Sequence, residues 1–128
     1  LELALAAGAT FVARDYSRGA DRLKGTLRRA VLHRGFSLVD VLQVCMTFNN
    51  LYQYYNERVA ELEEHNEESR TDAQARMTEW TYGGDGRIAL GVFFRDERTE
   101  TFDGHVVRKP VGLGEREAAI AKILARRV

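Results

Sequence analysis

The stretch ATFVARDYSRGADRLKGTLRRAVLHRGFSLVDVL, residues 9–42, decides the fold of the chain. Residues 9–14 are a short apolar run of β-prone side chains, and turn-forming residues 15–19 follow it. Residues 36–42 are apolar on both alternating faces apart from Asp40 and the small Ser37, as in a strand covered on both sides. Between the two runs, residues 20–33 carry apolar side chains at helical spacing, at Leu23, Leu27, Ala30 and Val31. The stretch therefore predicts a right-handed βαβ unit, in which the helix packs on one face of two adjacent parallel strands.

The residues before this unit predict a short helix. Residues 1–7 are rich in Ala and Leu, and Gly8 stands where a left-handed residue ends a helix. The chain opens inside this helix without a methionine or a capping residue. We therefore expect further sequence upstream.

The residues after the unit predict three more helices and one more strand. A helix over residues 51–62 has Tyr52 and Tyr55 on its buried face and runs into a solvated glutamate-rich face over residues 61–68. Thr71 opens a capping box for a helix that carries Met77 and Trp80. The last segments are listed in order: a turn at 83–86, a strand at 88–94, a polar loop at 99–109 with a possible short strand at Val106, and a helix at 115–127 with Ile120, Ile123 and Leu124 inward.

The composition excludes several classes of protein. The chain has 128 residues, and 19 Lys and Arg balance 19 Asp and Glu. Nucleic-acid affinity depends on a clustered excess of cations, and a membrane helix needs roughly 20 apolar residues in a row. We therefore expect neither nucleic acid nor a membrane as a partner. The single cysteine, Cys45, excludes an intramolecular disulfide and fits a reducing compartment, so we expect a cytoplasmic protein.

Cys45 is the strongest candidate for a functional side chain. It follows the second strand of the βαβ unit, and ligands of open α/β sheets bind beyond the carboxyl ends of strands. The alternative is a small buried hydrophobic residue, because free cysteine is among the most buried residue types. A metal bound by Cys45 would need further ligands from elsewhere, since the chain has no second cysteine.

The three histidines are weaker candidates. His33 stands at the negative end of the predicted helix dipole, so a helix-terminal cation or an exposed residue explains it better than a catalytic base. His65 and His105 lie in polar sequence without metal-ligand spacing.

The glycine-rich turn at residues 83–86 is not a phosphate-binding loop, because it lacks the Lys and the Ser or Thr of that motif. No catalytic or cofactor-binding residue is assigned.

Three segments together resemble the β subunit of the 2-oxoacid:ferredoxin oxidoreductases, most of all the 2-oxoglutarate type. They are LALAAGATFVAR at residues 3–14, HRGFSLVDVLQ at 33–43 and CMTFN at 45–49, and a looser likeness follows in EW at 79–80, IALGVFFR at 88–95 and ER at 97–98. In that family the β subunit binds thiamine diphosphate with Mg²⁺ and carries a [4Fe-4S] cluster. The enzyme decarboxylates a 2-oxoacid, transfers the acyl group to coenzyme A and reduces ferredoxin, with an α subunit as partner.

The resemblance implies a fold and a role for Cys45. The chain would be α/β and part of a three-layer, parallel-sheet, thiamine diphosphate-binding domain, to which residues 1–65 belong, while residues 66–128 would be a C-terminal extension packed on it or on a partner subunit. Cys45 matches the cysteine that supplies the last ligand of the [4Fe-4S] cluster. Val44 departs from the family pattern, which has Pro at that place; Pro fixes φ and gives no ligand, so we expect a change in loop stiffness rather than in iron binding.

The family's other cofactor motifs would lie upstream of Leu1. We therefore expect the isolated chain to be inactive and to bind none of these cofactors. The competing hypothesis is a non-catalytic α/β interaction or scaffold fragment, in which Cys45 is a core residue. A Cys-x-x-Cys pair and a diphosphate motif in the upstream sequence would distinguish the two.

Overall fold

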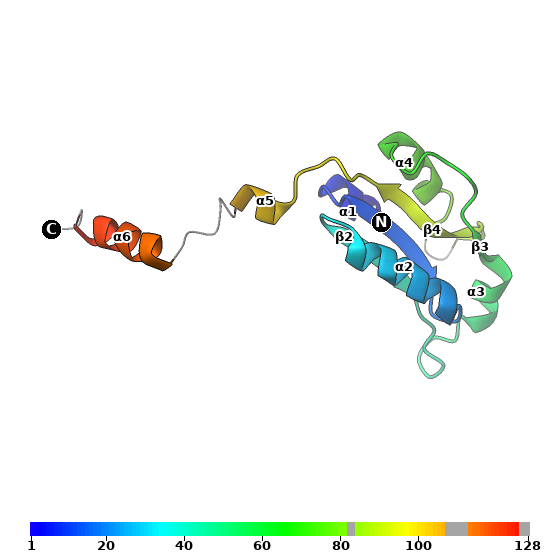
Figure 1. Cartoon of the computed structure of the whole chain (residues 1–128). Helices are drawn as coiled ribbons and strands as arrows, with labels where there is room; N and C mark the ends of the chain where they lie inside the picture. Colours follow the sequence, from blue (N-terminus) through cyan, green and yellow to red (C-terminus); the bar gives the residue numbers. More distant parts are fainter. Residues whose placement is uncertain (82–83, 107–112, 126–128) are drawn as a thin grey trace.

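The βαβ unit lies at the centre of the computed structural model, which describes residues 1–81, 84–106 and 113–125. β1 (Phe11–Tyr16) and β2 (Ser37–Leu42) are parallel and paired from Phe11 opposite Ser37 to Tyr16 opposite Leu42. α2 (Ala20–Leu32) connects them and packs on one face of both strands (Figure 1). The prediction of adjacent parallel strands covered by a helix is confirmed.

Two further strands extend the sheet on the far side of β1, in the order β2-β1-β4-β3. β4 (Ile88–Arg95) runs antiparallel to β1, and the short β3 (Val59–Glu61) runs parallel to β4. The expected α/β class is therefore confirmed, and the sheet as a whole is mixed. β4, predicted as a strand, supplies the antiparallel neighbour that protects one side of β1.

Helices cover both faces of the sheet, which gives the molecule three layers. Alternate residues of a strand point to opposite faces. On one face, Phe11 and Ala13 pack with Ala30 of α2. On the other, Val12 shares a core with Leu5 of α1 (Glu2–Ala6) and Met77 of α4 (Arg70–Thr78).

α1 ends as the sequence predicts. Gly8 has φ +91°, and its N–H donates to Leu5 O at 3.1 Å. Ala9 N–H reaches back to Ala4 O at 2.9 Å, which completes a Schellman cap. This cap turns the chain directly into β1.

The predicted third helix is shorter than its apolar spacing indicates. α3 (Tyr52–Arg58) ends where β3 begins, and Val59 pairs with Ile88 of β4. The prediction of a helix to residue 62 is wrong because the pairing with β4 competes with helical continuation. Tyr55 is buried as expected, whereas Tyr52 is 41% exposed.

The fourth helix starts earlier than predicted. Ser69 is its N-cap, and the Ser69 hydroxyl accepts the Asp72 N–H at 3.2 Å. Thr71 lies inside the first turn, so the predicted capping box is displaced by two residues. Trp80 follows the end of the helix and is buried.

The C-terminal segments differ most from expectation. A short helix, α5 (Phe102–Val106), replaces the possible strand at Val106. α6 (Leu113–Leu124) is the predicted terminal helix, but Ile120, Ile123 and Leu124 are more than half exposed rather than inward. The reason is that α5 and α6 extend away from the sheet, so no core faces them (Figure 1). Residue 83 of the predicted turn, 107–109 of the loop and 126–127 of the helix lie outside the described residues.

In the parts of the chain that the structure describes, every helix is too short or too polar to cross a membrane.

Candidate functional site at the end of β2

Cys45 stands on a loop whose two ends are anchored in the core. Val44 before it and Leu51 after it pack against a buried group of side chains at the carboxyl ends of β1 and β2. That group contains Tyr16, Leu42, Tyr55, Trp80, Ile88 and Leu90. The anchored ends fix where the loop leaves the sheet, and Cys45 is held outside the core.

Residues 45–49 form a closed turn around the sulfur of Cys45. Asn49 N–H donates to Cys45 O at 3.0 Å, which closes the turn. The nearby backbone N–H groups of Phe48 and Thr47 are the main cause that lowers the pKa of the Cys45 thiol from its ordinary value. A thiolate is the form of cysteine that attacks electrophiles and binds metals. The turn is therefore arranged to hold a sulfur anion.

The surface around the sulfur is open and apolar. Cys45 is exposed, and Met46 and Phe48 are 67% and 93% exposed. The alternative that Cys45 is a small buried hydrophobic residue is therefore wrong for this chain on its own. Arg18 follows the end of β1, and its Cζ atom lies 4.9 Å from the centre of the Tyr52 ring.

A charged pair that the sequence did not predict lies on the sheet face opposite α2. Arg14 of β1 and Asp40 of β2 lie side by side in the strand register, and Arg14 Nε donates to Asp40 Oδ2 at 2.8 Å. The guanidinium also lies 4.7 Å from the centre of the Trp80 ring. Both residues line a cavity of about 530 Å³ that extends from Leu1 to Thr81. In the sequence, Arg14 and Asp40 stand out only as single charged residues in two apolar runs. Their pairing follows from the register of β1 and β2, which the sequence does not show.

A second unpredicted group joins β1 to α2. Asp15 is fully buried, and its carboxylate accepts Arg22 Nη2 at 2.7 Å and the Thr26 hydroxyl at 2.7 Å. The backbone N–H of Tyr16 donates to it at 2.7 Å. Each oxygen thus has a partner, and the carboxylate orients α2 against β1 instead of facing a ligand.

His33 is not the helix-terminal cation that the sequence predicts. It caps α2, its Nε2 lies 2.8 Å from the Thr10 hydroxyl, and its ring packs near Phe11. Burial lowers the pKa of His33, against the smaller raising effect of Glu97. Its Nδ1 is buried and finds no hydrogen-bond partner within the described ranges. The neutral imidazole is therefore the favoured form.

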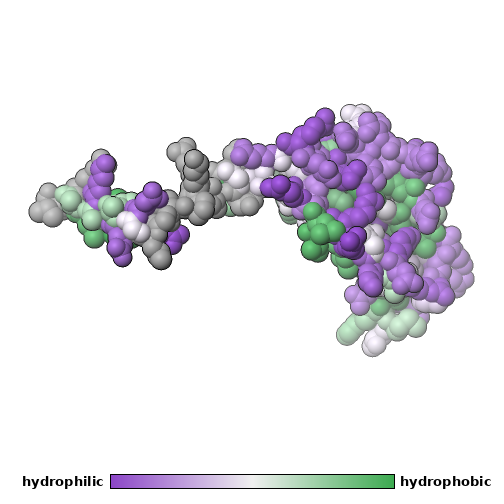
Figure 2. Space-filling model, viewed as in Figure 1, coloured by the Kyte–Doolittle hydropathy of each residue, from purple (hydrophilic) through white to green (hydrophobic). Residues whose placement is uncertain are grey.

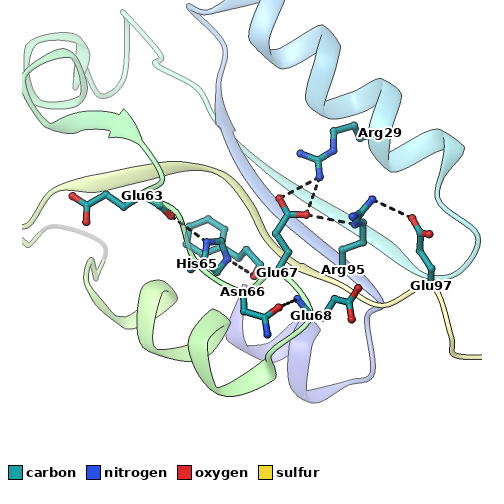
Figure 3. Close-up of polar contacts among 9 residues, drawn as sticks. Arg29, Glu63, His65, Asn66, Glu67, Glu68, Arg95 and Glu97 are labelled. Atoms are coloured by element: carbon teal, nitrogen blue, oxygen red, sulfur yellow. Dashed lines mark hydrogen bonds and ion pairs between the residues drawn. The ribbon is translucent and has the colours of Figure 1, made fainter.

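The glutamate-rich segment is not a solvated helical face. It runs along β4, where Arg95 N–H donates to Glu67 O at 2.8 Å. The Glu67 carboxylate lies 2.9 Å from Arg29 Nη2 of α2 and 3.4 Å from Arg95 Nε, as Figure 3 shows. His65 Nε2 lies 2.9 Å from Phe93 O. These contacts fasten the segment to the sheet, which gives His65 a structural explanation.

No metal site is complete in the described part of the chain. Residues 1–81, 84–106 and 113–125 contain no group of three or more His, Cys, Asp or Glu side chains placed to hold an ion. Cys45 is thus a single ligand at most. His105 lies in α5, apart from this turn.

Comparisons with known proteins match the chain to one family. The family model for the C-terminal part of the pyruvate ferredoxin oxidoreductase beta subunit matches residues 45–109, so the matched segment begins at Cys45. The 2-oxoacid:ferredoxin oxidoreductase 1 subunit beta of Aeropyrum pernix is 33% identical over 123 residues. The 2-oxoacid:ferredoxin oxidoreductase subunit beta of Saccharolobus solfataricus is 30% identical over 123 residues. Each alignment covers 85% of this chain.

A solved structure shares the fold. The chain aligns with the 2-oxoglutarate:ferredoxin oxidoreductase from Magnetococcus marinus, which holds 2-oxoglutarate, coenzyme A and succinyl-CoA, at a TM-score of 0.72 and 20% identity. That alignment covers 91% of this chain and 42% of the other. The chain spans 37% and 39% of the two curated relatives above. Because the family model matches residues 45–109 of 128, the chain belongs to the β-subunit family of the 2-oxoacid:ferredoxin oxidoreductases.

Proposed function

We propose that the complete protein is the β subunit of an enzyme that oxidatively decarboxylates a 2-oxoacid such as 2-oxoglutarate. The products would be an acyl-CoA and reduced ferredoxin. The family assignment supports this reaction, and so does a 46% identity over 50 residues to the 2-oxoglutarate oxidoreductase subunit KorB of Mycobacterium tuberculosis. That last alignment covers 39% of this chain and 13% of KorB. The observation that carries the proposal is the exposed, amide-bonded thiol of Cys45 at the first residue of the matched segment.

Cys45 would be one thiolate ligand of a [4Fe-4S] cluster. Such clusters are held by four thiolates, and amide N–H groups directed at a ligand sulfur stabilise its anionic charge. The turn at 45–49 fits one of the four positions because its sulfur is exposed and receives amide donors. The cluster would supply single-electron transfer when bound, and this chain's part would be to hold one of its thiolate ligands in place. The other three ligands would come from outside the chain.

The described residues do not fit the Mg²⁺ ion that accompanies thiamine diphosphate. A magnesium ion prefers oxygen ligands such as carboxylates, and the described ranges contain no group of three or more His, Cys, Asp or Glu side chains placed to hold an ion. The complete protein would supply that site from other residues. We therefore expect calorimetry of the isolated chain with thiamine diphosphate and Mg²⁺ to give no saturable isotherm. A one-to-one isotherm at micromolar concentration would contradict this expectation.

The proposed partners are an α subunit and ferredoxin, with a 2-oxoacid and coenzyme A as substrates, in the cytoplasm. Residues 1–65 would be the C-terminal portion of the thiamine diphosphate-binding domain. Residues 66–128 would pack on it or on a partner, and β4 of this part already lies beside β1.

The test replaces the sulfur in the complete α–β complex. Cys45→Ser should lower the iron content and alter the low-temperature electron paramagnetic resonance signal of the reduced enzyme, because a hydroxyl is a harder and poorer ligand for cluster iron than a thiolate. Met46→Ser is the matched control, since it puts the same side chain at the next exposed position of the turn. Unchanged iron content and signal in Cys45→Ser would overturn the role of Cys45.

Two further measurements separate the proposal from a non-catalytic scaffold. The complete complex should reduce ferredoxin when a 2-oxoacid and coenzyme A are both present. Rates with 2-oxoglutarate and with pyruvate should differ, and we expect 2-oxoglutarate to be preferred. A complex that reduces no ferredoxin with any 2-oxoacid would favour the scaffold.

A further inference from the structure

The outward side of α2 carries apolar and basic residues in one stripe. Lys24, Leu27, Arg28 and Val31 have the spacing i, i+3, i+4 and i+7, which places them on one face of the helix. We call these four residues the α2 outer face. Leu27 is 43% exposed and Val31 is 82% exposed. The core-facing side of the same helix is formed instead by residues such as Thr26 and Ala30.

The cations of the α2 outer face have no carboxylate partner. Among the described residues, no Asp or Glu oxygen lies within 4.0 Å of the Lys24 or Arg28 side chain. By contrast, Arg22 and Arg29 of the same helix pair with Asp15 at 2.7 Å and with Glu67 at 2.9 Å. These two arginines hold the helix to the rest of the fold, whereas Lys24 and Arg28 have no such partner among the described residues.

Apolar surface continues past the end of α2. Leu32, the last residue of α2, is 63% exposed. Figure 2 shows an apolar area, coloured green, at this end of α2. Contiguous exposed apolar side chains rimmed by charged ones mark protein–protein contact sites more often than solvated surface.

We propose that the α2 outer face is the docking site for an acidic, apolar-centred surface of another protein subunit. The unpaired cations would be matched by carboxylates on the partner. The exposed Leu27, Val31 and Leu32 would be matched by an apolar centre, which is typical of stable subunit interfaces. That this partner is the α subunit of an oxidoreductase rests on the proposed function. Electrostatic attraction would guide assembly, and burial of the apolar side chains would hold it.

The test is charge reversal in the full-length β subunit when it is expressed together with the α subunit. Lys24→Glu/Arg28→Glu should raise the dissociation constant of the complex at least tenfold and weaken its dependence on salt, because the attraction becomes repulsion. Lys24→Arg/Arg28→Lys keeps both charges and should assemble as the parent does. Light scattering behind size exclusion gives the dissociation constant, and hydrogen exchange of residues 20–32 should slow on assembly.

The outcomes separate this proposal from the proposed function. Assembly of Lys24→Glu/Arg28→Glu with parental affinity, or an equal loss in Lys24→Arg/Arg28→Lys, would overturn the docking site even in an active enzyme. Assembly that depends on α2 in a complex without ferredoxin reduction would overturn only the reaction. If the reversal leaves assembly intact but weakens ferredoxin binding, the assignment to a subunit is wrong. Urea unfolding of the free full-length β-subunit variants should match the parent. A loss of stability in Lys24→Glu/Arg28→Glu would show that another part of the β subunit covers the α2 outer face, and it would overturn the docking site.

Discussion

Cys45 is a single sulfur whose anion is stabilised by local backbone donors. Because the N–H groups of Phe48 and Thr47 lower its pKa, the folded chain should react with iodoacetamide at lower pH than a cysteine without such donors. The pH profile of the alkylation rate measures this, and the chain contains no other thiol to complicate it. The same profile in urea is the control, because unfolding removes the turn. Coincident profiles in the two states would show that the turn does not act on the sulfur.

His33 should make the stability of the fold depend on pH. Its pKa is lowered in the folded state, mainly by burial, so the unfolded chain binds more protons as the pH falls below about 6.5. Stability is then fully present above that pH and decreases towards the folded-state pKa, by at most about 1.4 kcal/mol per pH unit. His33→Gln, which keeps a polar atom near Thr10, should flatten this dependence in urea unfolding between pH 7.5 and 5.5. An unchanged slope would show that His33 does not carry this pH dependence.

At the scale of elements, the Asp15 carboxylate fixes the position of α2 on the sheet. Asp15→Ala removes the fully buried carboxylate and leaves Arg22 and the Thr26 hydroxyl without their shared acceptor. Loss of one member of a buried ion pair costs about 3–5 kcal/mol, and we expect the lower end because Arg22 is partly exposed. Urea unfolding measures the difference. Asp21→Ala on the exposed first turn of α2 is the matched control and should change stability by less than about 0.5 kcal/mol.

The elements show which parts of the fold were predictable from local sequence. The βαβ unit was, because its apolar residues repeat at a period of two in the strands and of 3.6 in the helix. The boundary at Arg58 was not, because Val59 also fits the apolar face of a longer helix and only Ile88, far along the chain, draws it into a strand. Cys45 was found from its place after a strand. Arg14 and Asp40 were not paired, because their contact depends on the strand register.

In the described residues, apolar surface is left uncovered at several places. β2 lies at the edge of the sheet, with Val41 38% exposed. Leu27 and Val31 of the α2 outer face, Met46 and Phe48 of the turn after β2, and Ile120, Ile123 and Leu124 of α6 are also exposed. A strand edge and exposed apolar helices are the features through which chains associate. We therefore expect the isolated chain to self-associate at high concentration.

α6 provides a test of this expectation that leaves the sheet intact. Ile120→Glu/Ile123→Glu places charge on the apolar side of α6, so it should reduce the mass that light scattering reports at high concentration. The same change should shift the free energy of unfolding of the sheet by less than about 0.5 kcal/mol, because both side chains are more than half exposed. Ala118→Glu/Ala121→Glu on the same helix is the control for added charge. A loss of more than about 1 kcal/mol would mean that α6 packs on the sheet in solution and that its apolar side chains belong to the core.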